Sequence, residues 1–376
     1  MKRVAKKILF VTGTRADYGK LNPLAIEAYE QGFDVNFFVT GMHMMEKYGL
    51  TKMEVHRNKE FNVIEFLNQR DGDPQEIILA KTINGFSDYL QEINPDMVVI
   101  HGDRIEAIAC SLVCATNYIL SVHIEGGELS GTIDEILRHC NTKLSTFHMV
   151  SSIEAKRRVI QLGETDQNVF VIGSPELDLH LRDSGVSISK VRERYEIKTE
   201  DYGICIFHPV TSETKSIGQQ SRDLFKALTS SQKYFVVILP NNDPGNIEIN
   251  KVIHGLDKDQ FRVIPSMRFN YFSELMKNSS IFIGNSSAGV REAPFIGIAS
   301  IDVGTRQANR AKSKSVYKCR ASEIDIIASL IDKNWNKRSK PDSSYGEGDA
   351  AKKFVEVLMN EELWSIPLQK YFKETK

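Results

Sequence analysis

Short runs of apolar residues recur along the whole chain and are separated by segments with helical spacing. The runs are rich in Val, Ile and Phe and lack the polar alternation of a half-exposed strand, which indicates parallel strands covered by helices on both faces. They lie at residues 7–11, 35–39, 97–101, 119–123, 148–150 and 169–172, and again at 204–208, 235–239, 261–264, 281–284 and 299–302. Amphipathic segments between them, such as 21–29, 78–93 and 105–114, predict helices. This alternation predicts a doubly wound α/β fold.

The hydrophobic rhythm is interrupted once, by polar sequence from residue 174 to about residue 202, and a new strand restarts it at 204. The number of strands is also too high for one comfortable sheet. We therefore predict two Rossmann-like domains with a central cleft, at residues 1–180 and 181–355. Residues 356–376 are expected to form a C-terminal helix that packs back on the N-terminal domain.

Composition narrows the class of protein. The chain has 376 residues, with 41% hydrophobic and 26% charged residues and a formal net charge of -1. These proportions are typical of a soluble globular protein, and the balanced charge argues against a nucleic-acid partner or a membrane surface. No apolar run has the ~20 residues of a membrane span, and no signal peptide is expected. Five cysteines without a C-x-x-C pair favour reduced thiols in a cytoplasmic protein.

A turn of small residues in the second half of the chain has the features of an anion site. The apolar strand at 281–283 leads into Gly284, Ser286 and Ser287 and then into a predicted helix. Backbone N–H groups and the positive end of a helix dipole attract phosphate, and the two serines add hydroxyl donors. Glu292, about one helical turn further, would accept hydrogen bonds from a ribose. The alternative is an ordinary strand-to-helix connection with a serine N-cap.

Carboxylates follow two buried strands of the first half. Asp103 and Arg104 come directly after the strand at 97–101, and Glu125 follows the strand at 119–123. Asp134 opens a helix a few residues later. Charged groups next to apolar strands are costly unless they are paired or functional, so we expect the three carboxylates to converge and to divide acid and base roles. Alternatively, Asp134 only starts a helix and Asp103 only bridges to Arg104.

Basic and polar residues follow other strands in both halves. Arg15 and Lys20 flank a helix start after the first strand, where an anion could sit, although Asp17 could simply cap that helix. In the second half, His208, Asn241 and Arg306 stand after successive strands, where they could reach a base, a ribose or phosphate charge. No His, Cys, Asp or Glu cluster has convincing metal-ligand spacing, so no metal is predicted. A G-x-G-x-x-G fingerprint for NAD is absent after the first strand.

Several motifs, in order and at matching separations, resemble one family almost end to end. The sequence is similar to the hydrolysing UDP-N-acetylglucosamine 2-epimerases of sialic acid biosynthesis. The motifs are GTRADY at 13–18, GMH at 41–43, HGDR at 101–104, HIEGGE at 123–128, RH at 138–139, NSSAGVRE at 285–292 and GTRQ at 304–307. The resemblance implies a GT-B-like fold in which the C-terminal domain holds most of the nucleotide.

The resemblance also implies roles for individual residues. Asp103, Glu125 and Asp134 match the catalytic carboxylates of the family. The residues that match its nucleotide-sugar contacts are Arg15, Arg104, His208, Asn241, Ser286, Ser287, Glu292 and Arg306. We assign catalysis to Asp103, Glu125, Asp134 and His208, and substrate binding to Arg15, Gly19, Lys20, Arg104, Arg138, Asn241, Ser286, Ser287, Glu292 and Arg306.

The implied reaction removes the C2 proton of the sugar as UDP leaves C1, and then hydrates the resulting 2-acetamidoglucal to N-acetylmannosamine. No hydride moves, so no cofactor is expected. Residues 40–43 lack the glutamines that non-hydrolysing relatives are expected to use, which favours the hydrolysing branch. GDP-N-acetylglucosamine, UDP-diacetamido-bacillosamine, a GT-B glycosyltransferase and a non-catalytic nucleotide-sugar sensor remain alternatives. The UDP-sugar is the expected partner, in a homodimer or homotetramer.

Overall fold

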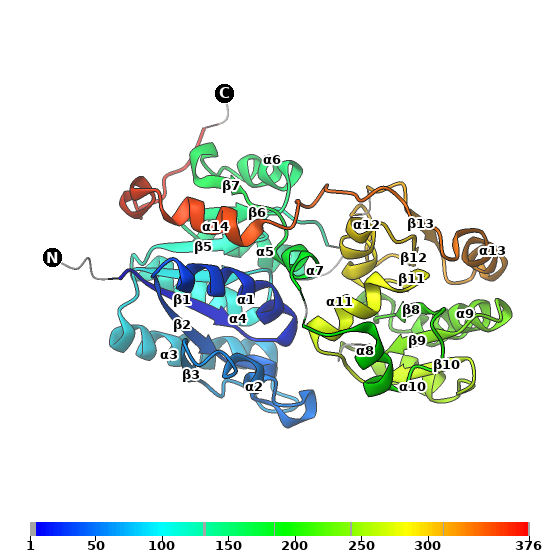
Figure 1. Cartoon of the computed structure of the whole chain (residues 1–376). Coiled ribbons are helices and arrows are strands. Elements are labelled where there is room, and N and C mark those ends of the chain that lie inside the picture. The colour runs from blue at the N-terminus through cyan, green and yellow to red at the C-terminus, as the bar shows by residue number, and fades with distance from the viewer. Residues whose placement is uncertain (1–4, 131–132, 184, 241–242, 311, 375–376) are drawn as a thin grey trace. The chain divides into compact units, whose positions relative to one another are not determined.

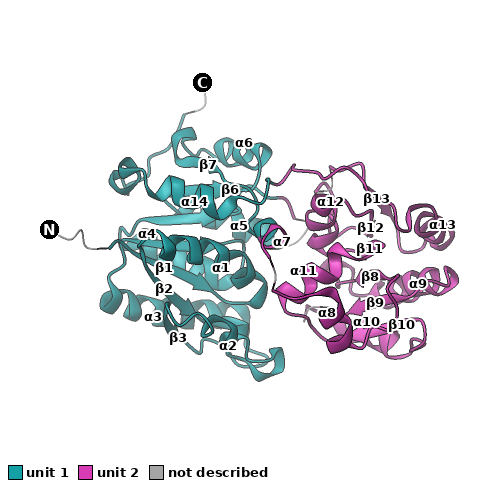
Figure 2. Cartoon of the chain, viewed as in Figure 1, with its two compact units in different colours: residues 1–128, 133–178, 346–376 teal, residues 129–132, 179–345 magenta. Residues whose placement is uncertain are grey.

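The computed structural model describes residues 5–130, 133–183, 185–240, 243–310 and 312–374. The chain divides into two compact units (Figure 2). Unit 1 comprises Met1–Glu128, Ile133–Asp178 and Gly346–Lys376, and unit 2 comprises Leu129–Thr132 and Leu179–Tyr345. Each unit contains one parallel sheet flanked by helices (Figure 1). The predicted fold class of two Rossmann-like α/β domains is therefore confirmed.

Unit 1 has a sheet in the order β3-β2-β1-β4-β5-β6-β7. Its strands are β1 (Lys7–Thr12), β2 (Asp34–Val39), β3 (Asn62–Glu65), β4 (Met97–His101), β5 (Ser121–Ile124), β6 (Phe147–Val150) and β7 (Val169–Val171). Its helices are α1 (Arg15–Glu30), α2 (Lys52–Val55), α3 (Gln75–Ile93), α4 (Ile105–Thr116), α5 (Ile133–Leu144), α6 (Ile153–Gln161) and α14 (Ala350–Leu358). Short 3-10 turns are η1 (Gly41–Met44), η2 (Glu46–Tyr48), η3 (Asp166–Asn168), η4 (Pro175–Leu177) and η7 (Glu361–Ser365).

Both faces of the first sheet are buried, as the unbroken apolar runs predict. Side chains alternate across a strand, so Ile8 and Phe10 of β1 join one core cluster, together with residues of α1 and α14. Leu9 and Val11 point the other way and pack with residues of α3 and α4. A strand that must be apolar on both sides cannot show polar alternation.

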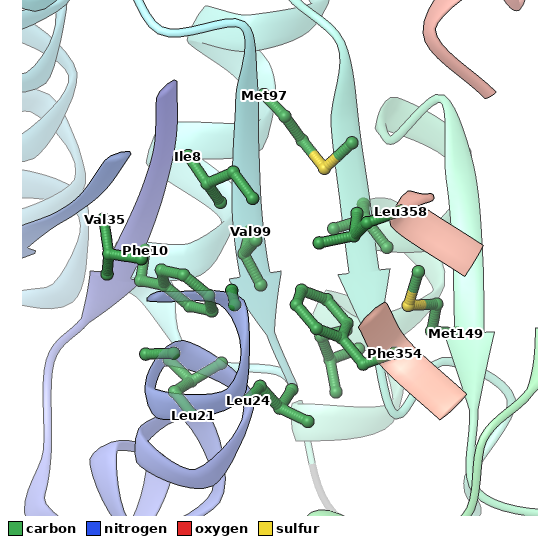
Figure 3. Close-up of a cluster of buried hydrophobic side chains, with 14 of the residues drawn as sticks. Ile8, Phe10, Leu21, Leu24, Val35, Met97, Val99, Met149, Phe354 and Leu358 are labelled. Carbon is green, nitrogen blue, oxygen red and sulfur yellow. The ribbon is translucent and has the colours of Figure 1, made fainter. Parts of the chain in front are cut away.

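Helix α14 returns from the C-terminal part of the chain to cover the first sheet. Figure 3 shows Phe354 and Leu358 packed beside the strands with residues of α1. Both side chains are almost completely buried, and the Phe354 ring centroid lies 6.1 Å from that of Phe10. Asp178 holds the start of this helix, because its carboxylate accepts hydrogen bonds from the backbone N–H groups of Ala350, at 2.9 Å, and Ala351, at 2.7 Å.

Unit 2 has a sheet in the order β10-β9-β8-β11-β12-β13. Its strands are β8 (Gly203–Ile206), β9 (Phe235–Ile238), β10 (Phe261–Ile264), β11 (Ile281–Gly284), β12 (Ser300–Val303) and β13 (Val316–Cys319). Its helical segments are α8 (Ile188–Tyr195), η5 (Thr211–Glu213), α9 (Ile217–Ser230), α10 (Asn246–His254), α11 (Phe269–Lys277), η6 (Ser287–Gly289), α12 (Glu292–Ile296) and α13 (Ile324–Asn334). Helix α7 (Asp178–Leu181) starts at the end of a unit 1 segment.

The strands of unit 2 are also buried on both faces. Cys205 and Phe207 belong to one cluster, with residues of α9, α10 and α13, while Ile204 and Ile206 belong to another, with residues of α8, α11 and α12. Within the described residues, no helix combines the length and the apolar character needed to cross a membrane.

We predict that Phe354→Ala destabilises unit 1 by about 3–5 kcal/mol, because it removes a fully buried aromatic side chain and leaves a cavity beside the sheet. Chemical denaturation followed by fluorescence measures the change. Phe372→Ala is the matched control, since Phe372 lies in the same C-terminal segment and is 88% exposed. Equal stability of the two variants would contradict a structural role for α14.

Candidate active site

The turn between β1 and α1 is built by helix capping. Thr14 is the N-cap of α1, and the Asp17 carboxylate accepts hydrogen bonds from the backbone N–H groups of Gly13 and Thr14, both at 3.0 Å. Asp17 also accepts from the Thr12 hydroxyl at 2.7 Å. In the structure, Asp17 therefore helps to cap helix α1, as the alternative interpretation of this turn predicts. The turn presents Arg15 as the first helical residue.

Arg15, Gly19 and Lys20 lie on α1, and their surroundings differ. The Arg15 guanidinium is partly exposed, and its Nη2 lies 3.2 Å from Oε1 of Glu54. Gly19 has open space where a Cβ would lie. Lys20 instead reaches a buried carboxylate, because its Nζ lies 2.6 Å from Oε2 of Glu125.

Glu125 follows β5 directly and is buried with cationic and polar partners. Besides Lys20, its Oε2 lies 3.3 Å from Nε2 of His101, the last residue of β4, and its Oε1 accepts a hydrogen bond from the Ser174 hydroxyl at 2.6 Å. The backbone of Glu125 has φ +62°, a conformation that costs a non-glycine residue about 1–3 kcal/mol. A strained, buried and charge-balanced carboxylate at a strand end has the features of a functional group.

Asp103 is paired with Arg138 and not with its neighbour Arg104. Arg138, on α5, is buried, forms an ion pair with Asp103 and donates a hydrogen bond to the backbone oxygen of Glu128 at 2.9 Å. Arg104 is more exposed, and its Nε lies 3.6 Å from Oε2 of Glu106. The Asp103 side chain keeps 24% of its surface exposed. The exposed part of this carboxylate can therefore contact a ligand while Arg138 balances its charge.

The three carboxylates Asp103, Glu125 and Asp134 are placed by the ends of β4 and β5 and by the start of α5. The backbone N–H of Gly102 donates to the carbonyl of Ile124 at 3.0 Å, so β4 and β5 end together. Glu125 is the first residue after β5, and Asp103 is the second after β4. Asp134 is half-buried in the first turn of α5, four residues before Arg138. Residues four apart share a helix face, so Asp134 lies on the side of α5 that carries Arg138.

The segment after β4 is fixed by residues that the sequence motifs did not single out for this purpose. The Gly102 carbonyl accepts hydrogen bonds from Nε2 of His123, at 2.8 Å, and from Nδ2 of Asn141, at 3.1 Å. Burial lowers the pKa of His123 to about 3, so the imidazole is neutral and Nδ1 accepts from the Thr142 hydroxyl. His123 is thus a structural residue behind the carboxylates.

In unit 2, Gly284 permits the close approach of two strand ends. Its φ is +130°, and an added Cβ would lie 2.0 Å from the carbonyl oxygen of Ile206. Only glycine fits there. Asn285 follows, and its side chain accepts from the backbone N–H of His208 at 2.6 Å and donates to the His208 carbonyl at 2.8 Å.

Asn285 also binds the loop after β12 through its backbone. Its backbone oxygen accepts hydrogen bonds from Nη1 of Arg306, at 3.2 Å, and from Nε2 of Gln307, at 3.0 Å. His208, Arg306 and the serine turn therefore meet around one asparagine. Burial, together with the positive charge of Arg306, holds the pKa of His208 well below its usual range. The imidazole is thus neutral near pH 7, so Arg306 supplies the positive charge here.

The serine turn leads into a 3-10 turn and then a short helix, and not directly into the predicted helix. Ser286 caps the 3-10 turn η6 by accepting a hydrogen bond from the N–H of Ala288 at 3.4 Å, and Ser287 begins that turn. Glu292 begins the short helix α12, and its Oε1 lies 2.8 Å from Nε2 of His180. His180, which the sequence did not suggest, also contacts Ser273 at 2.9 Å. Asn241 lies outside the described residues. Among the described residues, no His, Cys, Asp or Glu cluster is arranged to hold a metal ion.

Comparison with known proteins now defines the family. The model of the family described as UDP-N-acetylglucosamine 2-epimerase matches residues 25–359. The UDP-N-acetylglucosamine 2-epimerase of Neisseria meningitidis serogroup B is 42% identical over 371 residues, which are 98% of this chain and 98% of that protein. The chain belongs to the UDP-N-acetylglucosamine 2-epimerase family. The features that carry the resemblance are the motifs at 13–18, 41–43, 101–104, 123–128, 138–139, 285–292 and 304–307.

Another relative is named for a different nucleotide sugar. The UDP-N,N'-diacetylbacillosamine 2-epimerase (hydrolyzing) of Legionella pneumophila is 31% identical, with 97% of this chain and 98% of that protein covered. Among solved structures, UDP-GlcNAc 2-epimerase from Neisseria meningitidis bound to UDP-GlcNAc has a TM-score of 0.81 at 20% identity, with 94% of this chain and 100% of that chain covered. The 2-epimerase likeness establishes the GT-B-like fold.

We predict that Asn285→Ala destabilises unit 2, because the backbone N–H and C=O of His208 each lose a partner at a cost of about 1–3 kcal/mol. Thermal unfolding of the purified protein measures the loss. Asn278→Ala is the control, since Asn278 is exposed at the end of α11 and bonds only locally, to the carbonyl of Glu274. An unchanged unfolding midpoint for Asn285→Ala would contradict a stabilising role for its two hydrogen bonds to the His208 backbone.

Proposed function

We propose that the protein is a hydrolysing UDP-N-acetylglucosamine 2-epimerase that releases N-acetylmannosamine and UDP, a reaction that serves sialic acid biosynthesis. The observation that carries the proposal is the pair Asp103 and Glu125 at the ends of adjacent strands, each with its own cation. Inversion at C2 needs a base that removes the proton from one face of the sugar and an acid that returns a proton to the other, and two charge-balanced carboxylates are proposed to take these roles.

The reaction proceeds in two balanced stages. In the first, a carboxylate takes the C2 proton while the C1–O bond to the diphosphate breaks, which gives 2-acetamidoglucal and UDP. In the second, water adds its oxygen to C1 and a proton is delivered to the opposite face of C2. Asp103, Glu125 and Asp134 are the proposed acid and base groups, and no cofactor enters because no hydride is transferred.

Unit 2 is proposed to hold the departing UDP. Arg306 supplies positive charge, while the Ser286 and Ser287 turn supplies hydroxyl groups and backbone N–H groups. The neutral imidazole of His208 can donate one hydrogen bond to a phosphate oxygen, and a bound diphosphate favours its protonated form. Glu292, oriented by His180, is proposed to accept hydrogen bonds from the ribose hydroxyls.

The loop at residues 40–43 supports the hydrolysing branch. Non-hydrolysing relatives are expected to place glutamines here for a second substrate molecule. In this protein His43 is completely buried, and its ring nitrogens contact the hydroxyls of Thr12, at 3.0 Å, and Thr51, at 2.8 Å. The side chain therefore serves the interior of unit 1 and offers nothing to a second sugar nucleotide.

The same chemistry on a diacetamido-bacillosamine nucleotide is the second candidate. It is favoured by the relatives named for that substrate, at 31% identity in Legionella pneumophila and 29% in Campylobacter jejuni. The higher identity, 42%, to the Neisseria meningitidis enzyme named for UDP-N-acetylglucosamine supports that sugar as the first candidate.

We predict that incubation with UDP-N-acetylglucosamine in deuterated water yields UDP and free N-acetylmannosamine with deuterium at C2. The label arises because the carbon–hydrogen bond at C2 is broken and remade with a solvent-derived proton. Proton NMR follows both products without any acceptor. Unchanged substrate would exclude this sugar, and UDP-diacetamido-bacillosamine and GDP-N-acetylglucosamine would be tested next.

We predict that Asp103→Asn lowers kcat by about 100-fold or more, the usual size of a lost acid–base contribution, while the affinity for UDP stays within about threefold. Steady-state kinetics and calorimetric titration with UDP measure the two effects. Asp166→Asn is the control, because Asp166 is an exposed carboxylate paired with Lys156 at 2.9 Å in the same unit. Loss of UDP affinity in Asp103→Asn would instead make Asp103 a binding residue.

A further inference from the structure

Four side chains of unit 1 form a closed ring behind the proposed active site. Lys20 Nζ lies 2.6 Å from Oε2 of Glu125 and 3.4 Å from Oε1 of Glu176. The Ser174 hydroxyl oxygen lies 2.6 Å from the other oxygen of Glu125 and 2.7 Å from the other oxygen of Glu176. One lysine and one serine thus each touch both carboxylates.

The ring is enclosed and held by rigid elements. The side chains of Glu125 and Glu176 are only 7% and 6% exposed, and Ser174 is buried. Ser174 and Glu176 come from the turn after β7, where Ser174 precedes η4. An added Cβ on Gly346 would lie 2.8 Å from Cα of Gly173, so the returning chain leaves no space beside this turn. Such packing fixes both residues against the sheet.

The ring has two short contacts between Ser174 and a carboxylate oxygen but only one hydroxyl hydrogen to place in them. A serine hydroxyl has one hydrogen to donate, whereas an ionised carboxylate only accepts. Two carboxylate oxygens within 2.7 Å of the same hydroxyl oxygen cannot both receive that hydrogen. The second short O···O contact requires a proton of its own, which one of the two carboxyl groups must carry. One proton shared between Glu125 and Glu176 through Ser174 would supply a hydrogen to each of the two contacts.

We propose that Glu176 is the proton reservoir of the active site and that Ser174 relays its proton to Glu125. This inference rests on the proposed function, because it gives Glu125 an acid–base task. Glu125 is the closer of the two carboxylates to Lys20 and also has His101 3.3 Å away, so it holds the negative charge at rest. The shared proton then resides on Glu176.

The relay is balanced in protons and charge. The Glu176 carboxyl passes its proton to the Ser174 oxygen as the Ser174 hydroxyl hydrogen moves to Glu125. The O–H bond of Glu176 breaks, an O–H bond forms on Glu125, and the serine exchanges one O–H bond for another. Glu176 becomes a carboxylate, Glu125 becomes a neutral acid and the serine is unchanged. Lys20 touches both groups and stabilises the charge in either location. Glu125 can thus serve as a base in its charged form and as an acid after the relay.

Kinetics of two substitutions test the relay. Glu176→Gln can still donate a hydrogen bond to Ser174 but holds no transferable proton, and Ser174→Ala removes the bridge. Each is expected to lower kcat about tenfold or more with KM within about twofold, and to displace the pH profile of kcat. Ser174→Thr restores a hydroxyl and is expected to recover most of the activity. A raised KM with unchanged kcat and pH profile would overturn the relay and leave a structural role.

A matched control exists in the same unit. Glu65 has the same kinds of partner as Glu125, with Lys52 at 2.6 Å and His56 at 2.7 Å, but it lies on β3 away from the ring. Glu65→Gln is expected to keep the kcat and the pH profile of the unchanged protein. Circular dichroism of all variants confirms that they are folded.

A second measurement needs no substrate and separates this inference from the proposed function. Infrared spectroscopy of the ligand-free protein at neutral pH is expected to show the carbonyl stretch of a protonated carboxyl group, which Glu176→Gln removes and Glu65→Gln does not. Absence of that band in a protein that turns over UDP-N-acetylglucosamine would overturn the relay alone. The band in a protein that turns over no nucleotide sugar would support the shared proton and overturn the proposed reaction.

Discussion

The parallel pairing of β4 with β5 is the constraint on which the proposed chemistry depends. In this register His101 lies opposite Ile124, so the two strands end at the same edge of the sheet. Glu125 follows β5 directly and Asp103 follows β4 after Gly102. Both carboxylates are partly shielded from water, so each needs a nearby cation to balance its charge. Arg138 and Lys20 provide that balance from two different helices. A shift of one residue in the pairing would separate the carboxylates from each other and from these cations.

Most strands of the fold follow from the sequence because they are buried on both faces. Two strands, β3 and β13, were not predicted, and both lie at the edge of a sheet. Glu65 and Lys318 on these strands are polar and leave no continuous apolar run. The helix expected after the serine turn was also different, since a 3-10 turn precedes α12. Local capping by Ser286 favours that turn, and hydrophobic spacing does not report it.

The site was predicted less completely than the fold. The carboxylates and Lys20 stand next to apolar strands or helix starts, so their positions are visible in the sequence. Asn285, Asn141 and His123 escaped functional assignment because they act on backbone atoms of distant segments, and only tertiary structure brings these together. Ser174 and Glu176 fall at the start of a polar segment, which the sequence predicts to be a linker between the domains. A short polar segment gives no signal that it closes a ring around a carboxylate.

The return of α14 to the first sheet has a consequence for biosynthesis. Unit 2 is almost continuous in the chain, whereas unit 1 needs residues near both termini. A ribosome releases the chain from its N-terminus, so the sheet of unit 1 lacks the cover of Phe354 and Leu358 until all of unit 2 has been made. The segment translated second can complete its core first. The core of unit 1 can therefore be completed only after unit 2 has been translated, and the nascent sheet of unit 1 stays partly uncovered until then.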